Sequence, residues 1–133
     1  MDTIVTLALP TADRRAAYDF HRALGHDTPG DLAEDGVPEP LRVALNAGTE
    51  VMYIPTGGFG WVTAGRPTAE RGTTECLVGV ALAGRAEVDA FAARAAAAGG
   101  EVVTGPTERP WGIYSCVVAD PDGHLWEAAA PPA

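Results

Sequence analysis

Lysine is absent from the 133-residue chain, and serine occurs once, as Ser115. Without lysine the chain can build neither a phosphate-binding P-loop nor a Schiff base, which also excludes pyridoxal phosphate chemistry. The single serine lies in Tyr-Ser-Cys rather than Gly-x-Ser-x-Gly, so a hydrolase nucleophile elbow is excluded. The chain has nine arginines and 18 acidic residues, which gives a net charge of -9. Because no basic run occurs, we expect no nucleic-acid or membrane partner, whereas a neutral or cationic small ligand remains open.

Long apolar runs are also missing. No stretch approaches the roughly 20 apolar residues of a membrane span, and no basic region followed by a long apolar one opens the chain. We therefore expect a cytoplasmic protein. The hydrophobic content of 47% and the chain length fit one globular domain over residues 1–133.

The first half of the chain shows a strand, a helix and a hairpin. Apolar residues alternate over 5–9, which predicts a half-buried strand, and a helical pattern then runs from Asp13 to Gly25. Residues 26–40 are rich in acids, prolines and glycines and predict a loop. Two short strands follow at 41–46 and 50–54.

The second half repeats this plan. A strand is predicted around 78–82 and a helix over 86–98, followed by strands at 101–104, 113–119 and 124–129. Each half thus reads as a strand, a helix and up to three strands, which indicates an internal duplication. We place the modules at about 1–56 and 75–130, joined by a loop at 57–74. A βαββαβ ferredoxin-like fold would leave one strand too many.

Two motifs accompany the duplication. Residues 119–127 read Ala-Asp-Pro-Asp-Gly-His-Leu-Trp-Glu, and Asp13 precedes Phe-His-Arg-Ala-Leu-Gly at 20–25. Together they resemble the vicinal oxygen chelate superfamily, which includes glyoxalase I, bleomycin-resistance proteins and extradiol dioxygenases. The resemblance implies an α+β fold in which two βαβββ modules form a cup-shaped mixed sheet with helices outside. It also implies a homodimer.

Enzymes of that superfamily bind a divalent metal through four positions on the cup wall. The resemblance places these positions at Thr6, near Met52, near Leu77 and at Glu127. Only Glu127 offers a good ligand for a divalent ion, because threonine is a weak ligand, methionine is soft and leucine has no donor. A one-residue alignment error would bring in Glu50 but no histidine. We therefore expect no cofactor and no divalent metal.

The sequence pattern places no histidine well for general-base catalysis. Strand alternation places His124 on the face opposite Glu127, so a surface or turn-capping role is expected. His21 takes an aromatic position on its helix and is expected to pack in the core, although a general-base role stays open. His26 follows the helix and is expected to be solvated.

Aromatic and polar residues are the candidates for ligand contact. Trp61 lies in a glycine-rich loop that we interpret as a hinge or lid, and Trp111 lies between a proline and a glycine. Flat rings at a cup mouth suit a planar ligand, although core packing is the commoner role of tryptophan. The predicted ligand-binding residues are Thr6, Arg42, Met52, Trp61, Trp111 and Glu127.

The sequence leaves two main hypotheses open, beside a housekeeping protein of unknown ligand. The first is a metal-independent binding protein that sequesters a hydrophobic or planar small molecule, as antibiotic-resistance members of the superfamily do. The alternative is a glyoxalase-like lyase or isomerase that uses Glu127 as proton acceptor, with or without a metal. Binding is favoured over catalysis because the chain has no lysine, has a single serine and has lost three of the four metal-ligand positions.

Overall fold

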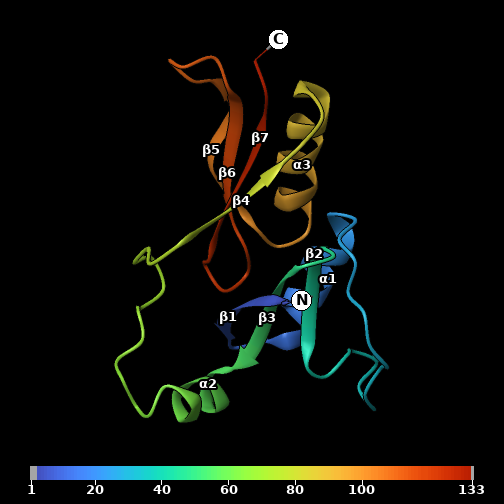
Figure 1. The fold of residues 1–133 in the computed structure, drawn as a ribbon, viewed down its shortest axis with the longest axis vertical. Coiled ribbons are helices and arrows are strands. Elements are labelled where there is room, and N and C mark those ends of the chain that lie inside the picture. The colour runs from blue at the N-terminus through green and yellow to red at the C-terminus, as the bar shows by residue number, and fades with distance from the viewer. Residues whose placement is uncertain (1–2, 133) are drawn as a thin grey trace. The chain divides into compact units, whose positions relative to one another are not determined.

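The computed structural model describes residues 3–132, so residues 1, 2 and 133 of the predicted domain lie outside the described part. The chain divides into two compact units, Met1–Thr68 and Ala69–Ala133 (Figure 1). The elements of the first unit are β1 (Val5–Thr11), α1 (Arg14–Ala23), β2 (Leu41–Asn46), β3 (Thr49–Pro55) and α2 (Thr56–Val62). Those of the second unit are β4 (Leu77–Ala81), α3 (Arg85–Ala97), β5 (Glu101–Glu108), β6 (Tyr114–Ala119) and β7 (Leu125–Ala130).

The first unit is a three-stranded sheet in the order β1-β3-β2 with α1 on one face. β1 runs parallel to β3, and β2 runs antiparallel to it. Asp13 begins α1 by accepting a hydrogen bond from the Ala16 amide, and Gly25, with a φ of 81°, follows its end. The buried face of α1 packs on the sheet through a core that includes Ala17, Phe20, Leu41, Val43 and Val51.

The second unit has a four-stranded sheet in the order β4-β7-β6-β5, with α3 packed against β5, β6 and β7. Its β4–β7 pair is parallel, and β7–β6 and β6–β5 are antiparallel. The β1-β3-β2 order of the first unit matches β4-β7-β6, which confirms the α+β class and the modular plan. Its core comprises Val78, Val88, Phe91, Ala92, Ala95, Cys116, Val118, Trp126, Ala128 and Ala130.

One predicted strand of the first module is abbreviated. Where the second unit places β5 beside β6, the first has only an antiparallel bridge between Asp27 and Ala44. The acidic, glycine- and proline-rich stretch around 26–40 cannot sustain a longer ladder, because proline donates no hydrogen bond and glycine weakens a strand. This segment is instead held by contacts such as the Arg14–Asp35 ion pair at 2.7 Å.

The predicted loop at 57–74 is wrong at its start, where α2 occupies Thr56–Val62. Glycine disfavours helices, so the sequence Gly-Gly-Phe-Gly pointed away from one. Two contacts compensate: the Thr56 hydroxyl donates to the carbonyl of the distant Thr11 at 3.2 Å, and the Gly65 amide closes the far end on the Gly60 carbonyl at 2.9 Å. The glycines therefore belong to a short helix.

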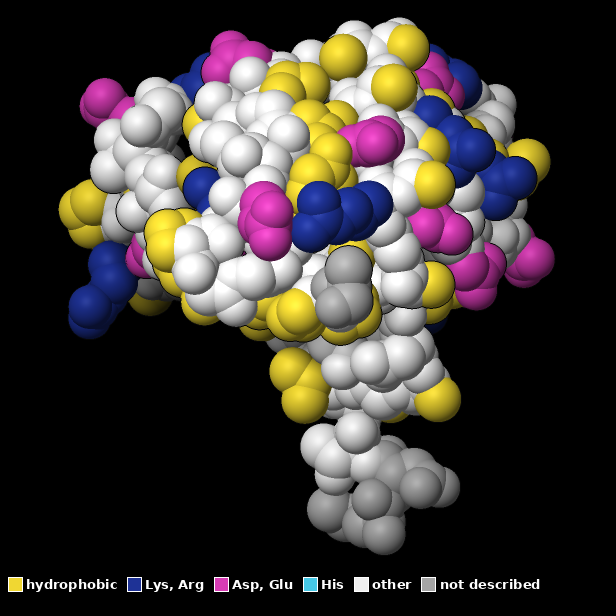
Figure 2. All heavy atoms as spheres, turned by 90° about the horizontal axis from the view of Figure 1, so that it is seen from above, with side chains coloured by type: hydrophobic (Ala, Val, Ile, Leu, Met, Phe, Trp, Pro, Cys, Tyr) yellow, Lys and Arg dark blue, Asp and Glu magenta, His cyan; other side chains and the backbone are white. Residues whose placement is uncertain are grey.

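No helix among the described residues is long and apolar enough to cross a membrane. On the face drawn in Figure 2, arginine side chains lie among acidic ones and do not merge into a continuous basic surface.

Candidate functional site

The face of the first sheet opposite α1 carries polar side chains. Val51 and Tyr53 of β3 are buried on the α1 side, so alternation sends Glu50 and Met52 to the opposite face. The register then pairs Glu50 with Thr6 on β1, and Met52 with Arg42 on β2. Three of the predicted ligand-binding residues therefore share one face with Glu50.

Arg42 and Glu50 form an ion pair on this face. Arg42 Nε lies 3.5 Å from Glu50 Oε2, and the two side chains are 44% and 18% exposed respectively. Glu50 Oε2 is buried and has no hydrogen-bond partner among the described residues. The arginine thus neutralises a carboxylate that is largely withdrawn from water. Sequence reasoning gave Glu50 only as an alignment alternative, although its spacing of two from Met52 already placed both on one face.

Glu127 occupies the matching position in the second unit. It lies on β7 between the buried residues Trp126 and Ala128, so its side chain points to the face away from α3. Its strand partners are Gly79 on β4 and Val117 on β6. Glu127 is half-buried and has neither a hydrogen bond nor an ion pair with the described residues. Trp126, by contrast, is fully buried and packs in the core, which is the commoner role of tryptophan.

The β5–β6 hairpin adds an arginine and a tryptophan. A turn at 109–112 is closed by the Gly112 amide, which donates to the Arg109 carbonyl at 2.9 Å. Trp111 lies in this turn and is 66% exposed. Arg109 Nε donates to Ser115 Oγ at 2.9 Å, and Ser115 is fully buried. Sequence reasoning missed Arg109, because nothing in the local pattern distinguishes it from the other arginines.

Trp61 lies on α2 and is 84% exposed, so it is available for contact with another molecule. The residue belongs to the first unit, whereas Trp111 belongs to the second. The structure thus leaves both predicted tryptophans accessible, in contrast to Trp126.

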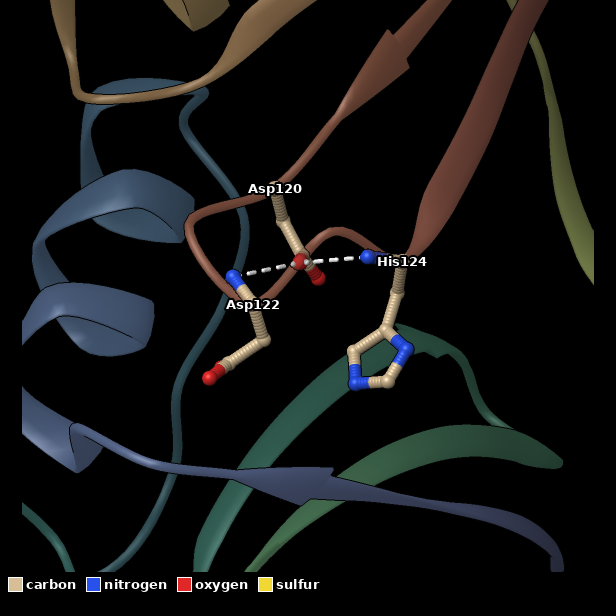
Figure 3. A group of neighbouring side chains, drawn as sticks. All are labelled: Asp120, Asp122 and His124. Atoms are coloured by element: carbon tan, nitrogen blue, oxygen red, sulfur yellow. Dashed lines mark hydrogen bonds between the residues drawn. The ribbon is translucent and has the colours of Figure 1, made fainter. Parts of the chain in front are cut away.

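The turn before β7 has the three side chains best spaced for a metal ion. Asp120, Asp122 and His124 offer ligand atoms within 4.8 Å of one another. However, Asp120 is buried and its Oδ1 accepts hydrogen bonds from the amides of Asp122 and His124, each at 3.0 Å (Figure 3). Trp126 Nε1 donates to its other oxygen at 3.3 Å. The central carboxylate is therefore committed to holding the turn and the core tryptophan.

His21 and His26 lie on the helix side of the first sheet. His21 is fully buried; its Nε2 lies 2.7 Å from the Tyr53 hydroxyl, and its Nδ1 lies 2.9 Å from His26 Nδ1. Burial, with a smaller contribution from His26, lowers the pKa of His21 to about 3. Burial also lowers the pKa of His26, which is half-buried, so its predicted solvation is wrong. The buried site of His21 leaves it no access to substrate, which removes the general-base option.

The family model for the Glyoxalase/Bleomycin resistance protein/Dioxygenase superfamily matches residues 3–128. The chain belongs to this superfamily. No curated protein matches significantly. Among solved structures, the hypothetical protein SA1046 from S. aureus has a TM-score of 0.81 at 24% identity, covering 98% of this chain and 94% of that one.

Other solved structures are similar at lower TM-scores. TioX from Micromonospora sp. ML1 has a TM-score of 0.66 at 26% identity, covering 96% of this chain and 98% of its own. Lactoylglutathione lyase from Agrobacterium tumefaciens also has a TM-score of 0.66, at 20% identity, covering 98% and 94%. These likenesses establish the fold.

The four positions that bind the divalent metal in the superfamily's enzymes carry few suitable donor atoms in this chain. Thr6 and Met52 supply a hydroxyl and a thioether, and Leu77 supplies nothing. Glu50 would have to exchange its ion pair with Arg42 for the metal. Glu127 is the one remaining carboxylate among these positions. The residues present therefore do not fit the metal.

Proposed function

We propose that this superfamily member binds a hydrophobic or planar small molecule on the sheet faces opposite α1 and α3, without a metal and without changing a bond in the ligand. The observation that carries the proposal is the contrast between two kinds of residue. Accessible tryptophans and a few charged side chains are available, whereas His21 is buried, His26 is half-buried against it, and His124 is half-buried in the turn before β7.

The predicted contacts divide between the two units. In the first unit, Arg42, Thr6 and Met52 would line the ligand, with Trp61 nearby in sequence as a stacking ring. In the second unit, Trp111 would stack and Glu127 would accept a hydrogen bond. Sequestration of this kind matches the bleomycin-resistance part of the superfamily's description.

Tryptophan fluorescence tests the proposal directly. A panel of planar and hydrophobic antibiotics is titrated into the purified, metal-free protein, and we expect saturable quenching by at least one member. Trp61→Phe should weaken binding to the face of the first unit, or Trp111→Phe binding to the face of the second. Arg94→Gln, which changes an exposed residue of α3, is the matched control and should not. The proposal fails if no panel member binds or if the bound compound is recovered altered.

A glyoxalase-like lyase or isomerase is the second candidate. It is favoured by one observation, the half-buried carboxylate of Glu127, which has no partner among the described residues and could accept a proton. Metal analysis and turnover of a hemithioacetal substrate distinguish the two candidates. A stoichiometric divalent ion that is lost in Glu127→Ala, together with turnover, would establish the enzyme and overturn the binding proposal.

We also propose a homodimer, as the family implies. β1 is an edge strand of the first sheet, and it exposes Val5 and Leu7, which are 53% and 40% accessible. An exposed apolar edge is a surface that soluble proteins normally cover, and a second copy would cover it. Sedimentation equilibrium should give twice the mass of the chain, and Leu7→Glu should shift the distribution toward monomer.

A further inference from the structure

Arg109 differs from the other arginines in combining partial burial with the lack of an ion pair with the described residues. Arg14 and Arg42 are paired with carboxylates, and Arg85 pairs with Glu108. The other arginines without an ion pair among the described residues are exposed; they are Arg15, Arg22, Arg66, Arg71 and Arg94. In a chain of net charge -9, a half-buried guanidinium is expected to form an ion pair with an Asp or Glu side chain. Arg109 forms no such pair with the described residues, which suggests that it binds an anionic group from outside the chain.

The guanidinium is held in a fixed orientation. The Arg109 amide donates to the Ile113 carbonyl at 2.7 Å, and its own carbonyl accepts from Gly112, so the backbone is fixed by the hairpin. Its Nε donates to the buried Ser115 hydroxyl, whose sequence neighbour Cys116 packs against α3. Because the Nε–H is used, the edge formed by the two terminal nitrogens stays available. That edge matches the two oxygens of a carboxylate.

Glu127 shares this face and restricts what can bind. Ser115 pairs with Ala129 on β7, and Glu127 precedes Ala129 by two residues, so Glu127 lies diagonally across the strands from Ser115. Such diagonal positions are about 7–8 Å apart, within the span of a small molecule. A polyanion such as phosphate would be repelled by Glu127. A molecule with one carboxylate and a nearby amino or other donor group would satisfy both side chains.

We propose that Arg109, positioned by Ser115, binds the carboxylate of a small organic ligand on the helix-free face of the second sheet, with an amino or other donor group of that ligand directed to Glu127. This specifies the chemical class of the ligand and rests on the proposed binding function. The exposed ring of Trp111, two residues along the hairpin, supplies an apolar contact for the ligand's body.

Three probes of similar shape test the charge requirement. L-phenylalanine carries both groups, 3-phenylpropionate only the carboxylate, and phenylalaninamide only the amine. Binding is followed by NMR through the Arg109 Nε–Hε resonance, which is assigned from its loss in Arg109→Lys. We expect phenylalanine to bind best and the amide about 10–100-fold more weakly, because the amide cannot accept two charge-assisted hydrogen bonds.

Variants identify the residues that carry this preference. Arg109→Gln should remove the preference for the acid over the amide, and Ser115→Ala should weaken acid binding while keeping that preference. Arg94→Gln, the matched exposed arginine, should leave both unchanged. Arg109 is not among the buried core residues, so Arg109→Gln should retain the near-ultraviolet circular dichroism of the folded protein, which confirms that lost binding is not unfolding.

Several results would overturn the inference. Equal affinity for the acid and the amide, an Arg109 resonance that no carboxylate probe shifts, or tighter binding of inorganic phosphate would each do so. The proposed function is tested separately. If an uncharged antibiotic quenches tryptophan fluorescence equally in the wild type and in Arg109→Gln, the binding function stands and the carboxylate site does not.

Discussion

Acid should destabilise this protein well above the range in which carboxylates titrate, because of the buried pair of His21 and His26. His21 is inaccessible to water and lies within hydrogen-bond distance of Tyr53 and His26. The 2.9 Å contact between the two Nδ1 atoms needs one donor and one acceptor, so at least one of the two rings must be neutral. Protonating both rings would leave two donors facing each other.

The magnitude follows from linkage. The pKa of His21 falls from 6.5 to about 3 in the folded protein, so the unfolded chain binds a proton between these values and the folded chain does not. The contribution to stability is therefore fully present above pH 6.5 and is lost as the pH falls toward about 3. Each pH unit in that window costs about 1.4 kcal/mol, so roughly 2 kcal/mol is lost by about pH 5. The lowered pKa of His26 adds to this loss.

Urea unfolding at about pH 7.5 and at about pH 5 measures this difference. His21→Gln removes the titrating ring but keeps a side chain that can form hydrogen bonds, so the variant should lose about 2 kcal/mol less than the wild type over this interval. His124→Gln serves as the matched control because it leaves the buried pair intact. Parallel pH profiles for the wild type and His21→Gln would refute the reasoning. So would an NMR titration in which His21 gains a proton near pH 6.

Three further predictions concern local structure. Asp120→Ala should lower the free energy of unfolding by about 2–4 kcal/mol, since it leaves buried Trp126 Nε1 and two turn amides without their acceptor, and urea unfolding measures this loss. Gly25→Ala should cost about 1 kcal/mol in the same assay, because alanine is strained at a φ of 81° even with open space around it. The pKa of Tyr114 is raised, first by the hydrogen bond its hydroxyl donates to Asp89, so Asp89→Asn should lower it in an ultraviolet titration.

The sequence predicted the elements whose pattern is local. The α3 helix was expected at 86–98 and occupies Arg85–Ala97, because a regular apolar stripe fixes which face packs on the sheet. The hairpin strands β2 and β3 were likewise expected within a residue of their bounds. A local pattern of this kind shows which residues face the core without knowledge of distant contacts. The repeat of the pattern in the second half therefore indicates the duplicated module.

The parts that sequence reasoning missed depend on contacts between distant residues. α2 is stabilised by a bond from Thr56 to Thr11, which no local propensity registers. The site at Arg109 depends on a buried serine that the hairpin brings back against it. The sequence around the single serine excludes a hydrolase elbow but does not predict that its hydroxyl positions Arg109. Composition shows what is absent, whereas the role of a residue depends on what the fold places beside it.

The two glutamates show how the duplicated modules have diverged. Glu50 pairs with Thr6 on the parallel strand, and Glu127 pairs with Gly79, so the two occupy equivalent positions. Glu50 is neutralised by Arg42, whereas Glu127 has no such partner among the described residues. One carboxylate is thus structural and the other is available.

Paired variants should separate these two roles. Arg42→Ala leaves the Glu50 carboxylate without its cation and should lower the free energy of unfolding by on the order of 1 kcal/mol, a modest loss because the arginine is half exposed. Glu127→Gln should leave that free energy almost unchanged in urea, since it breaks no contact, but should weaken phenylalanine binding while sparing 3-phenylpropionate. The assignment is wrong if Glu127→Gln destabilises the fold as much as Arg42→Ala does, because Glu127 would then be structural as well.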